Sequence, residues 1–350
     1  MNRRAFLASC MLTAMTLYAE DKKVEADLKI LNFDDYFAED TVKNFELLTG
    51  KKVHLDTYGS ESEAISKFLV SNPRYDLMFI SDLNVERFIR LGGLLSKIDK
   101  KEIPNISNIE KSFLTAQFDP GRKYSLPYFW GTLGIGYRKS AFKQKPNTLK
   151  YLLDSDRYKG RIALLADGAT NIQMALKYLG FSLNTTDKNE FQKAVSLLKK
   201  QAPHIKYFAA DNGQDLLKNG DVDIILEWNG DMLQLIEDSD EFGFVVPKEG
   251  TLLWEDCMVL PKRSKNKELA QEFINYLYEQ KTGANLAKYL QYATPNKKVK
   301  EIMDSSYLEN EAIFPTKEVL QKCEKIKYNG AEVKSWQDKA WADILGKEER

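Results

Sequence analysis

Aromatic and carboxylate side chains occur together at several points of this sequence where a short apolar run ends. Phe33 and Asp35 are two residues apart, and so are Trp254 and Asp256. Two residues is the side-chain period of a strand, so each pair shares a face if the chain is extended there. The pattern continues at three further places, which are Trp228 with Asp231, Ser81 with Asp82, and Asp167.

Each of these places, taken alone, has an ordinary structural explanation. Aromatic residues on strands usually belong to a core, and an Asp after a strand usually caps a helix or forms a turn. The dipeptide Asn229-Gly230, between Trp228 and Asp231, is itself typical of a turn. It is the recurrence of the pattern in both halves of the chain that favours a binding site.

Aromatic faces combined with carboxylates suit a small organic cation. An ammonium group gains charge-assisted hydrogen bonds from carboxylates, and it gains about 0.5–2 kcal/mol from each aromatic face on which it lies. Methylene groups between two ammonium groups are apolar and pack on Trp and Tyr. A neutral sugar uses the same types of side chain, so sugars are the nearest competing class of ligand.

The segments that carry these residues alternate between strand and helix patterns. Short apolar runs predict strands, and apolar residues at helical spacing predict helices between them. In the first part of the chain the expected strands are 28–33, 53–58 and 75–80, and the expected helices are 42–48, 60–71 and 85–91. This alternation predicts a parallel sheet that is covered by helices on both faces.

A second cycle of elements begins after residue 131. Residues 134–137 are expected to form a strand that changes its neighbours. The other expected elements are strands 161–165, 223–228 and 244–246, helix 171–179, an extended segment 252–260, a helix from Asn266 and a charged helical tail from Glu311. Two α/β lobes joined by extended crossings would leave a cleft, with ligands beyond the carboxyl ends of the strands.

The element pattern also suggests how the chain is divided between the lobes. We expect a first lobe of residues 20–131 plus 257–302 and a second lobe of residues 132–256 plus 303–350. The segments 131–136 and 254–258 join one cycle of elements to the other. They are therefore the expected hinges if the lobes close around a ligand.

The first 19 residues are typical of an export signal. A basic pair at residues 3–4 precedes an uncharged apolar run that ends at Ala19, before a polar start at Glu20. The run of about 15 residues is shorter than the roughly 20 that span a membrane. We expect cleavage after Ala19 and export to the periplasm. The basic pair also fits a twin-arginine signal, and residues 7–10 fit a lipoprotein cleavage box.

The composition is that of a soluble globular protein with balanced charge. The 350 residues include 51 Lys and Arg against 51 Asp and Glu, without the basic excess that is typical of nucleic-acid-binding proteins. The two His and three Cys show no C-x-x-C or H-E-x-x-H spacing, so no metal or cofactor is predicted. Cys257 and Cys323 could form a disulfide in an oxidising compartment.

Five motifs occur in an order and spacing that together are specific. They are Tyr124-Ser125-Leu126-Pro127-Tyr128 with Trp130-Gly131, Gln173-Met174-Ala175-Leu176, Trp228-Asn229-Gly230, Trp254-Glu255-Asp256 and Tyr292-Ala293-Thr294-Pro295-Asn296. With them the chain resembles, over essentially its whole length after residue 19, the spermidine/putrescine-binding periplasmic proteins of bacterial ABC transporters. The resemblance implies an α/β, two-lobed type II periplasmic binding protein fold with a ligand cleft between the lobes. It also implies a monomer that hands a polyamine to a membrane permease.

The resemblance further implies a set of ligand-binding residues. Phe33 stands where the family often has a cleft Trp, and Asp256 stands at the central acid of an aromatic box. Asp82 is an additional acid beside the cleft. The full set is Phe33, Asp35, Tyr36, Ser81, Asp82, Asp167, Thr170, Trp228, Asp231, Trp254, Asp256, Tyr292 and Gln337.

Two departures from the family pattern bear on the choice of ligand. Thr170 stands where spermidine binders have a second acid, and Leu83 stands where they have an aromatic residue. Conversely, Asp231 resembles the putrescine-selective branch of the family. We therefore expect putrescine to bind at least as well as spermidine.

Other function classes stay open at this point. An exported hydrolase could use paired carboxylates, but the sequence contains no nucleophile elbow, P-loop or G-x-G-x-x-G motif. A binder of a sugar, iron or an amino acid is also compatible with the composition. An amino-acid binder needs an Arg for the ligand carboxylate, and the aromatic–acid segments contain none. The sequence therefore favours a binding protein over an enzyme.

Overall fold

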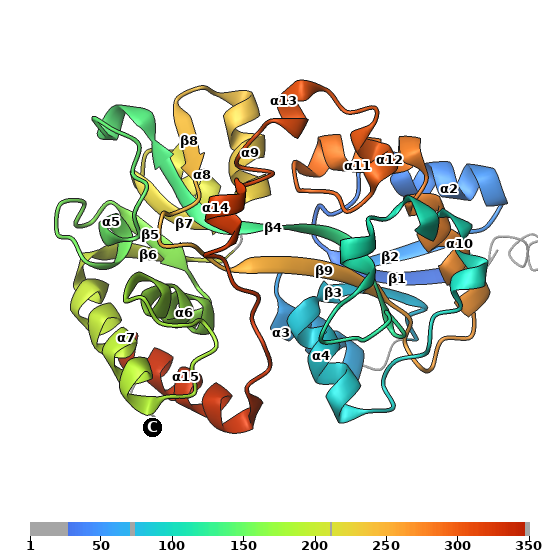
Figure 1. Ribbon diagram of the computed structural model, residues 1–350, viewed down its shortest axis with the longest axis horizontal. Helices are drawn as coiled ribbons and strands as arrows, with labels where there is room; N and C mark the ends of the chain where they lie inside the picture. Colours follow the sequence, from blue (N-terminus) through green and yellow to red (C-terminus); the bar gives the residue numbers. More distant parts are fainter. Residues whose placement is uncertain (1–26, 71–73, 211, 347–350) are drawn as a thin grey trace, which may run out of the picture.

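The computed structural model describes residues 27–70, 74–210 and 212–346, which form two α/β lobes side by side (Figure 1). The expected export signal at residues 1–19 lies outside these ranges. In the part of the chain that is described, no helix has both the length and the apolar character needed to cross a membrane.

The first lobe contains the parallel strands that the sequence predicts. Its elements are β1 (Leu28–Phe33), α2 (Thr41–Thr49), β2 (Val53–Tyr58), α3 (Glu61–Leu69), β3 (Leu77–Ser81) and α4 (Asp82–Leu91). The strands lie in the order β2–β1–β3, and both pairs are parallel. Gly50 ends α2 with a φ of 68°, a left-handed conformation that favours glycine. Ser60 begins α3 by accepting a hydrogen bond from the backbone N–H of Glu63.

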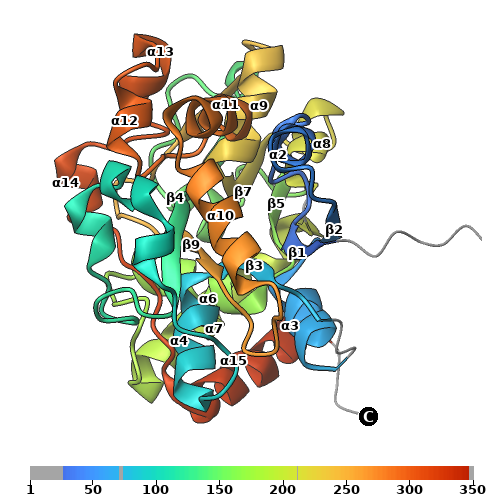
Figure 2. The same ribbon diagram turned by 90° about the vertical axis from the view of Figure 1, so that its right-hand side faces the viewer.

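Helices cover both faces of this first sheet. Figure 2 shows α2 and α10 (Lys267–Leu277) on one face and α3 and α4 on the other. Phe45 of α2 packs against Phe273 of α10, with ring centroids 4.8 Å apart. Phe68 and Phe88 make the corresponding contact between α3 and α4 at 5.4 Å. The helix that was expected to start at Asn266 is therefore confirmed.

The second lobe has the same plan, with more elements than the sequence analysis expected. Its elements are α5 (Lys150–Leu153), β5 (Ile162–Leu165), α6 (Gly168–Tyr178), α7 (Lys188–Gln201), β6 (Ile205–Ala209), α8 (Gly213–Lys218), β7 (Ile224–Trp228), α9 (Asn229–Asp238) and β8 (Phe242–Val245). β5 pairs in parallel with both β6 and β7. The sequence analysis named neither β6 nor α7, although α7 carries a well-capped start at Asp187.

Two strands connect the lobes. β4 (Ser125–Arg138) pairs with β9 (Leu253–Val259) through its first part, and with β7 and β8 through its last part. The prediction of a strand that changes its neighbours is thus confirmed. All these pairs are antiparallel, as is the pair β3–β9. The expectation of a parallel sheet is therefore wrong at the centre, because β4 and β9 pass from one lobe to the other without a crossover helix.

Side chains along β9 alternate between two buried environments. Trp254 and Met258 belong to the large core under α10, whereas Cys257 and Val259 belong to the smaller core under α3 and α4. The strand therefore presents Trp254, Asp256 and Met258 on one face, and Glu255, Cys257 and Val259 on the other. The expected hinges and lobe boundaries at these crossings stay predictions.

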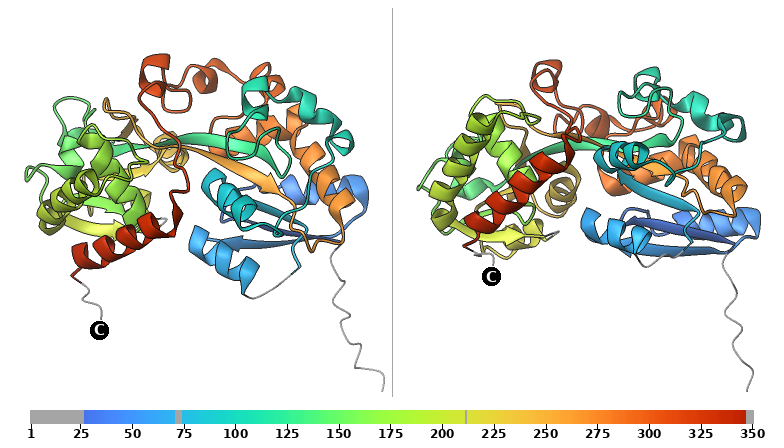
Figure 3. Two further views of the ribbon diagram at one scale, coloured as in Figure 1. Left: turned by 60° about the horizontal axis from the view of Figure 1, so that its bottom comes forward. Right: turned by 90° about the horizontal axis from the view of Figure 1, so that it is seen from below.

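The chain after β9 returns over the junction of the lobes. It forms α10, α11 (Gln280–Leu290), α12 (Lys297–Lys300), α13 (Ser305–Leu308), α14 (Lys317–Leu320) and α15 (Gly330–Ile344). The helical tail that was expected from Glu311 is present only in part, as α14 and α15, because residues 321–329, here called the strap, contain no helix. Figure 3 shows the strap crossing between the lobes before α15 reaches the second lobe. The backbone N–H of Glu324 donates to the carbonyl of Thr251 at 2.9 Å, beside the start of β9.

Two smaller features complete the fold. Short 3-10 helices lie at Lys100–Glu102, Pro104–Asn108, Lys111–Leu114, Lys139–Ala141 and Ala202–His204. Cys257 is buried and Cys323 is partly buried, and both are free thiols. The disulfide that the sequence allowed is therefore not formed, because Cys257 faces Arg122 and Glu255 instead.

Candidate functional site

Five of the predicted site residues form a continuous row of aromatic rings across the junction of the lobes. The row starts at Phe33, whose ring centroid lies 5.0 Å from that of Tyr36. Tyr36 lies 5.9 Å from Tyr292, and Tyr292 lies edge-on to Trp254 at 4.7 Å. Trp254 in turn lies 6.2 Å from Trp228 of the second lobe. We call these five residues the aromatic row.

The junction of β7 and α9 positions Trp228, which is the end of the row in the second lobe. Trp228 is the last residue of β7, and α9 begins at the next residue. The predicted turn at Asn229-Gly230 is therefore wrong. The Asn229 side chain is fully buried and accepts a hydrogen bond from the backbone N–H of Thr132. A Cβ atom at Gly230 would lie 2.4 Å from the ring of Tyr292, so this close approach of α9 requires glycine.

Asp256 is a buried carboxylate at the centre of the row, with 8% of its surface exposed. It accepts a hydrogen bond of 2.6 Å from the hydroxyl of Tyr36. Burial raises the pKa of Asp256 well above its usual range, and the nearby acids Glu61 and Asp82 raise it further. The hydrogen bond from Tyr36 lowers it. Among the described residues, no ion pair involves Asp256. The predicted shared face of Trp254 and Asp256 is confirmed.

Asp231 is a second carboxylate beside the row. It lies in the first turn of α9 and accepts a hydrogen bond of 3.3 Å from the hydroxyl of Tyr292. Two tyrosine hydroxyls of the row thus each donate a hydrogen bond to one carboxylate. Tyr36 donates to Asp256, and Tyr292 donates to Asp231. Such an arrangement can bind two cationic groups of one ligand while the rings cover its apolar middle.

A third acidic position lies at the start of α6. Asp167 caps this helix by accepting hydrogen bonds from the backbone N–H of Ala169 at 3.0 Å and from the hydroxyl of Thr170 at 2.9 Å. Its carboxylate is exposed, whereas Thr170 is buried. Burial raises the pKa of Glu61, at the start of α3, and the charge of Asp167 adds to that rise. The charge of Asp167, in the second lobe, thus acts on Glu61 of the first lobe.

Ser81 and Asp82 lie where β3 meets α4. Ser81 is opposite Asp256 in the β3–β9 register, and its backbone N–H donates to Glu61 at 2.9 Å. Asp82 is buried, and burial raises its pKa to about 7, although Lys325 acts in the opposite direction. Its Oδ2 atom lies 3.5 Å from the ammonium nitrogen of Lys325. Asp82 is thus already engaged by a side chain of the protein.

Two predicted site residues are not joined to this cluster. The shared face of Phe33 and Asp35 is wrong, because β1 ends at Phe33 and Asp35 lies in a turn with a φ of 51°. Asp35 is exposed, and its charge contributes to a raised pKa of Tyr289. Gln337 is half-buried in α15, which packs on α6 and α7. The ligand-binding roles of both residues stay predictions.

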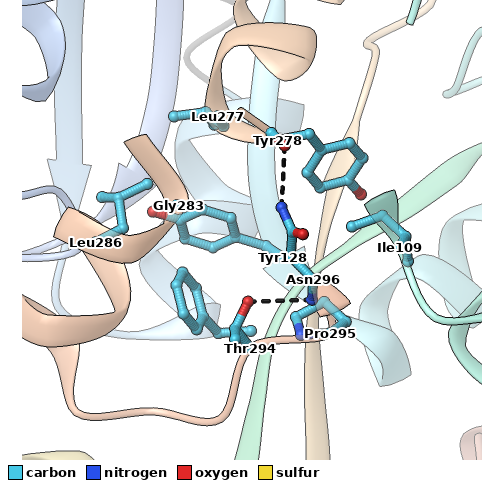
Figure 4. A pocket seen from close by; sticks show the side chains of 10 residues that line it. Ile109, Tyr128, Leu277, Tyr278, Gly283, Leu286, Thr294, Pro295 and Asn296 are labelled. Carbon is cyan, nitrogen blue, oxygen red and sulfur yellow. Dashed lines mark hydrogen bonds between the residues drawn. The ribbon is translucent and has the colours of Figure 1, made fainter. Parts of the chain in front are cut away.

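Two hollows lie near the row. One is a groove of about 780 Å³ that Asp231 lines together with residues before α2 and residues of α8, α9 and α11. Its acidic members besides Asp231 are Glu39, Asp40, Asp215, Glu237 and Asp238. The other is a cavity of about 10 Å³ behind Tyr128, with room for at most about one water molecule. Figure 4 shows Asn296, one of the residues that line this cavity, donating to the Tyr278 carbonyl, at 3.0 Å.

Sequence reasoning missed two charged residues of this region, Glu61 and Lys325. Glu61 stands in a segment that has only the pattern of a helix start, and Lys325 stands in a segment that was expected to be helical. In the described ranges, no group of three or more His, Cys, Asp or Glu side chains is arranged to hold a metal ion.

Comparisons with known proteins agree with this architecture. The family model described as bacterial extracellular solute-binding protein matches residues 40–316. The spermidine/putrescine-binding periplasmic protein of Escherichia coli is 31% identical over 322 residues, which cover 91% of each chain. The putrescine/cadaverine-binding protein of Pseudomonas aeruginosa is 29% identical over 359 residues, which cover 98% of this chain and 99% of that protein.

A solved structure gives the same result. The substrate-binding protein PotD of a spermidine/putrescine ABC transporter of Streptococcus pneumoniae superposes with a TM-score of 0.81 at 30% identity, covering 91% of this chain and 98% of that chain. The family match thus extends over most of the sequence and over the two-lobed fold. This chain belongs to the bacterial extracellular solute-binding proteins.

Proposed function

We propose that this protein binds a small polyamine in the periplasm, putrescine at least as tightly as spermidine, and delivers it to the permease of an ABC importer. The observation that carries the proposal is the aromatic row, in which Tyr36 and Tyr292 each hold one carboxylate. The relatives named for spermidine, putrescine and cadaverine support the same class of ligand.

Asp256 supplies the main electrostatic argument. A buried carboxylate without a cation is costly, because its charge has lost its contact with water. An ammonium group of the ligand would offset that cost and would also lie against Tyr36 and Trp254. A neutral sugar could donate hydrogen bonds to the same carboxylate through its hydroxyl groups but would leave the charge of Asp256 uncompensated.

The positions of the other acids bear on the length of the ligand. Asp231 provides a second carboxylate along the row, so a diamine can place one ammonium group at each end. Beyond that pair, Thr170 contributes a hydroxyl that already donates to Asp167. A triamine such as spermidine brings a third ammonium group to a region with fewer charges available for it.

Calorimetric titration with putrescine, spermidine and glucose tests the proposal. We expect one-to-one binding of both amines, putrescine at least as tight as spermidine, and no binding of glucose. The variant Asp231→Asn should weaken putrescine binding. Asp343→Asn removes an exposed ion pair between α15 and Lys199 of 3.1 Å. Asp343 does not line the groove beside Asp231, so this variant should bind putrescine as the wild type does. Tight binding of glucose, or spermidine tenfold tighter than putrescine, would contradict the proposal.

The proposal includes export, removal of residues 1–19, and action as a monomer whose lobes close about residues 131–136 and 254–258. Mass spectrometry of the exported protein should give an N-terminus near Glu20, and a lipid-modified Cys10 would contradict this. Small-angle scattering should show a smaller radius of gyration when putrescine is saturating. An unchanged radius would count against closure.

A further inference from the structure

The strap lies between the two lobes (Figure 3) and runs along one face of α4. This face carries Asp82, Glu86 and Arg90, which follow one another at a spacing of four residues and therefore lie on the same side of the helix. The other side of α4 packs into the core of the first lobe through buried Val85 and Phe88. The charged face is thus the part of α4 that meets the strap.

Each of the three charged residues contacts the strap. Asp82 Oδ2 lies 3.5 Å from the ammonium nitrogen of Lys325. Glu86 Oε2 accepts a hydrogen bond of 2.9 Å from the backbone N–H of Tyr328. The guanidinium of Arg90 lies 6.0 Å from the centre of the Tyr328 ring, and its Nε donates to Glu86 Oε1 at 3.1 Å. The strap is therefore bound along the length of α4, from its first turn to its last.

The second lobe holds the strap from the other side. The side chain of Asn184, in the loop between α6 and α7, donates to the carbonyl of Lys325 at 2.9 Å. The same side chain accepts a hydrogen bond of 2.7 Å from the backbone N–H of Lys327. Glu324 forms an ion pair of 2.7 Å with Lys177 of α6. The chain then continues into α15, which packs on α6 and α7, so the strap is attached to the second lobe on both sides of Tyr328.

The two sets of contacts respond differently to a movement of the lobes. The bonds to Asn184 and Lys177 stay intact when the lobes open, because the strap moves together with α6. The contacts with α4 break, because α4 belongs to the first lobe. Glu86, Arg90 and Tyr328 therefore stabilise the closed arrangement, although none of them belongs to the aromatic row.

We propose that the strap is a latch, whose contacts with α4 form when the lobes close and increase the affinity for the ligand from outside the binding site. This inference rests on the proposed function, in which the lobes close around a polyamine. The apparent affinity of a ligand that requires the closed form depends on the fraction of the protein that can adopt this form. The latch raises that fraction for every ligand alike, so it leaves the choice between putrescine and spermidine unchanged.

Calorimetric titration of Glu86→Ala measures the contribution of the latch. This variant removes the acceptor of the Tyr328 N–H, so the affinities for putrescine and spermidine should fall by the same factor, about tenfold. Arg90→Met keeps this acceptor and loses the contact with the ring, so both affinities should fall only about two- to threefold. In both variants the ligand should dissociate faster and associate at nearly the rate of the wild type, because it enters the open form.

Glu46→Ala is the matched control. Glu46 of α2 likewise accepts a hydrogen bond of 2.9 Å from a backbone N–H, that of Val53, and forms an ion pair with Lys52. All of these partners belong to the first lobe, so both affinities should remain those of the wild type. An equal loss in Glu46→Ala would overturn the inference. Unchanged affinities in folded Glu86→Ala and Arg90→Met proteins, or a loss for one amine alone, would do so too.

Amide hydrogen exchange, followed by NMR, tests the latch directly. The Tyr328 N–H should exchange at least about tenfold more slowly at saturating putrescine, because its bond to Glu86 exists only in the closed form. The Val53 N–H should respond far less, and in Glu86→Ala the effect at Tyr328 should be lost. Equal exchange of Tyr328 in the free and the saturated wild type would overturn the inference. If the wild type binds neither amine, the proposed function itself fails, which is a different result from binding without this protection.

Discussion

Glu255 and Asp256 are neighbours in β9, and both are buried, yet their surroundings differ in kind. Burial disfavours the ionised form of both carboxyls. Lys325 and Arg122 nevertheless bring the pKa of Glu255 below its usual range. Asp256, on the opposite face, accepts a hydrogen bond from Tyr36 and meets further acids, and its pKa is raised. One strand thus carries an acid that the fold neutralises and an acid that it does not.

The difference indicates how a structural acid can be told from an acid that is available to a ligand. Glu255 has the partners that a buried charge requires, so it can contribute to the stability of the lobe junction without a ligand. Asp256 has rings around it and no cation, so its charge is offset only when a cation enters. The comparison predicts that loss of Glu255 affects folding, whereas loss of Asp256 affects binding.

The largest effect is expected for Glu255→Gln. Its Arg122 partner would remain buried with less compensation, so the free energy of unfolding should fall by about 3–5 kcal/mol. Urea denaturation of the ligand-free protein measures this change. The putrescine affinity of the folded fraction should stay within about threefold of the wild type, since no contact of the aromatic row is removed. A stable Glu255→Gln protein with lost binding would reverse the assignment of the two acids.

A somewhat smaller effect, on binding, is expected for Asp256→Asn. Removing one partner of a desolvated charge pair costs about 2–5 kcal/mol, which lowers the affinity roughly 30-fold or more. Calorimetric titration with putrescine measures it, and an unchanged affinity would exclude Asp256 from the site.

The stability of the same variant provides an independent check. A carboxyl whose pKa is raised in the folded state binds more protons there than in the unfolded chain. Its contribution to stability therefore falls as the pH rises from the unfolded pKa toward the folded one. Ligand-free Asp256→Asn should consequently be at least as stable as the wild type at pH 8, in contrast to Glu255→Gln.

The smallest effect is expected at the start of α6. Thr170→Glu adds a carboxylate next to Asp167. The ion pair of this carboxylate with an ammonium group of spermidine would be partly exposed, so the preference should shift only several-fold toward spermidine. Competition titrations with putrescine and spermidine measure the shift. Equal changes for both amines would mean that Thr170 only belongs to the helix start.

The sequence was most informative where a residue's role follows from local periodicity. The spacing of Trp254 and Asp256 predicts a shared face because the chain there is a strand over its whole length. The same spacing failed for Phe33 and Asp35, because the strand ends at Phe33, as the expected range 28–33 already indicates, and Asp35 lies in the turn that follows. Likewise, the Asn229-Gly230 dipeptide predicts a turn, but the contact of Gly230 with Tyr292 explains the glycine instead.

The rest of the site depends on contacts between distant segments. Lys325 reaches Asp82 from the strap, and the strap's path is set by backbone pairing with Thr251 and Leu253. The periodicity of the tail gives no sign of this pairing. The charge of Asp167, in the second lobe, acts on Glu61 of the first, an interaction that exists only once both lobes are assembled. The antiparallel pairs of β9 with β3 and β4 at the centre of the sheet also depend on contacts between distant segments, since the direction of a strand is decided by long-range pairing.

The most direct test of the central claim is the number of protons released when putrescine binds. Burial raises the pKa of Asp256 and so favours the protonated form of this carboxyl in the free protein, whereas an ammonium group on the ligand favours the ionised form. Calorimetric titration at pH 7 in buffers of different ionisation enthalpy should show release of up to about one proton. The affinity should rise from pH 6 to pH 8, and Asp256→Asn should lose most of the release. Binding without proton release, or with the same release in Asp256→Asn, would contradict the claim that the ligand meets this carboxylate.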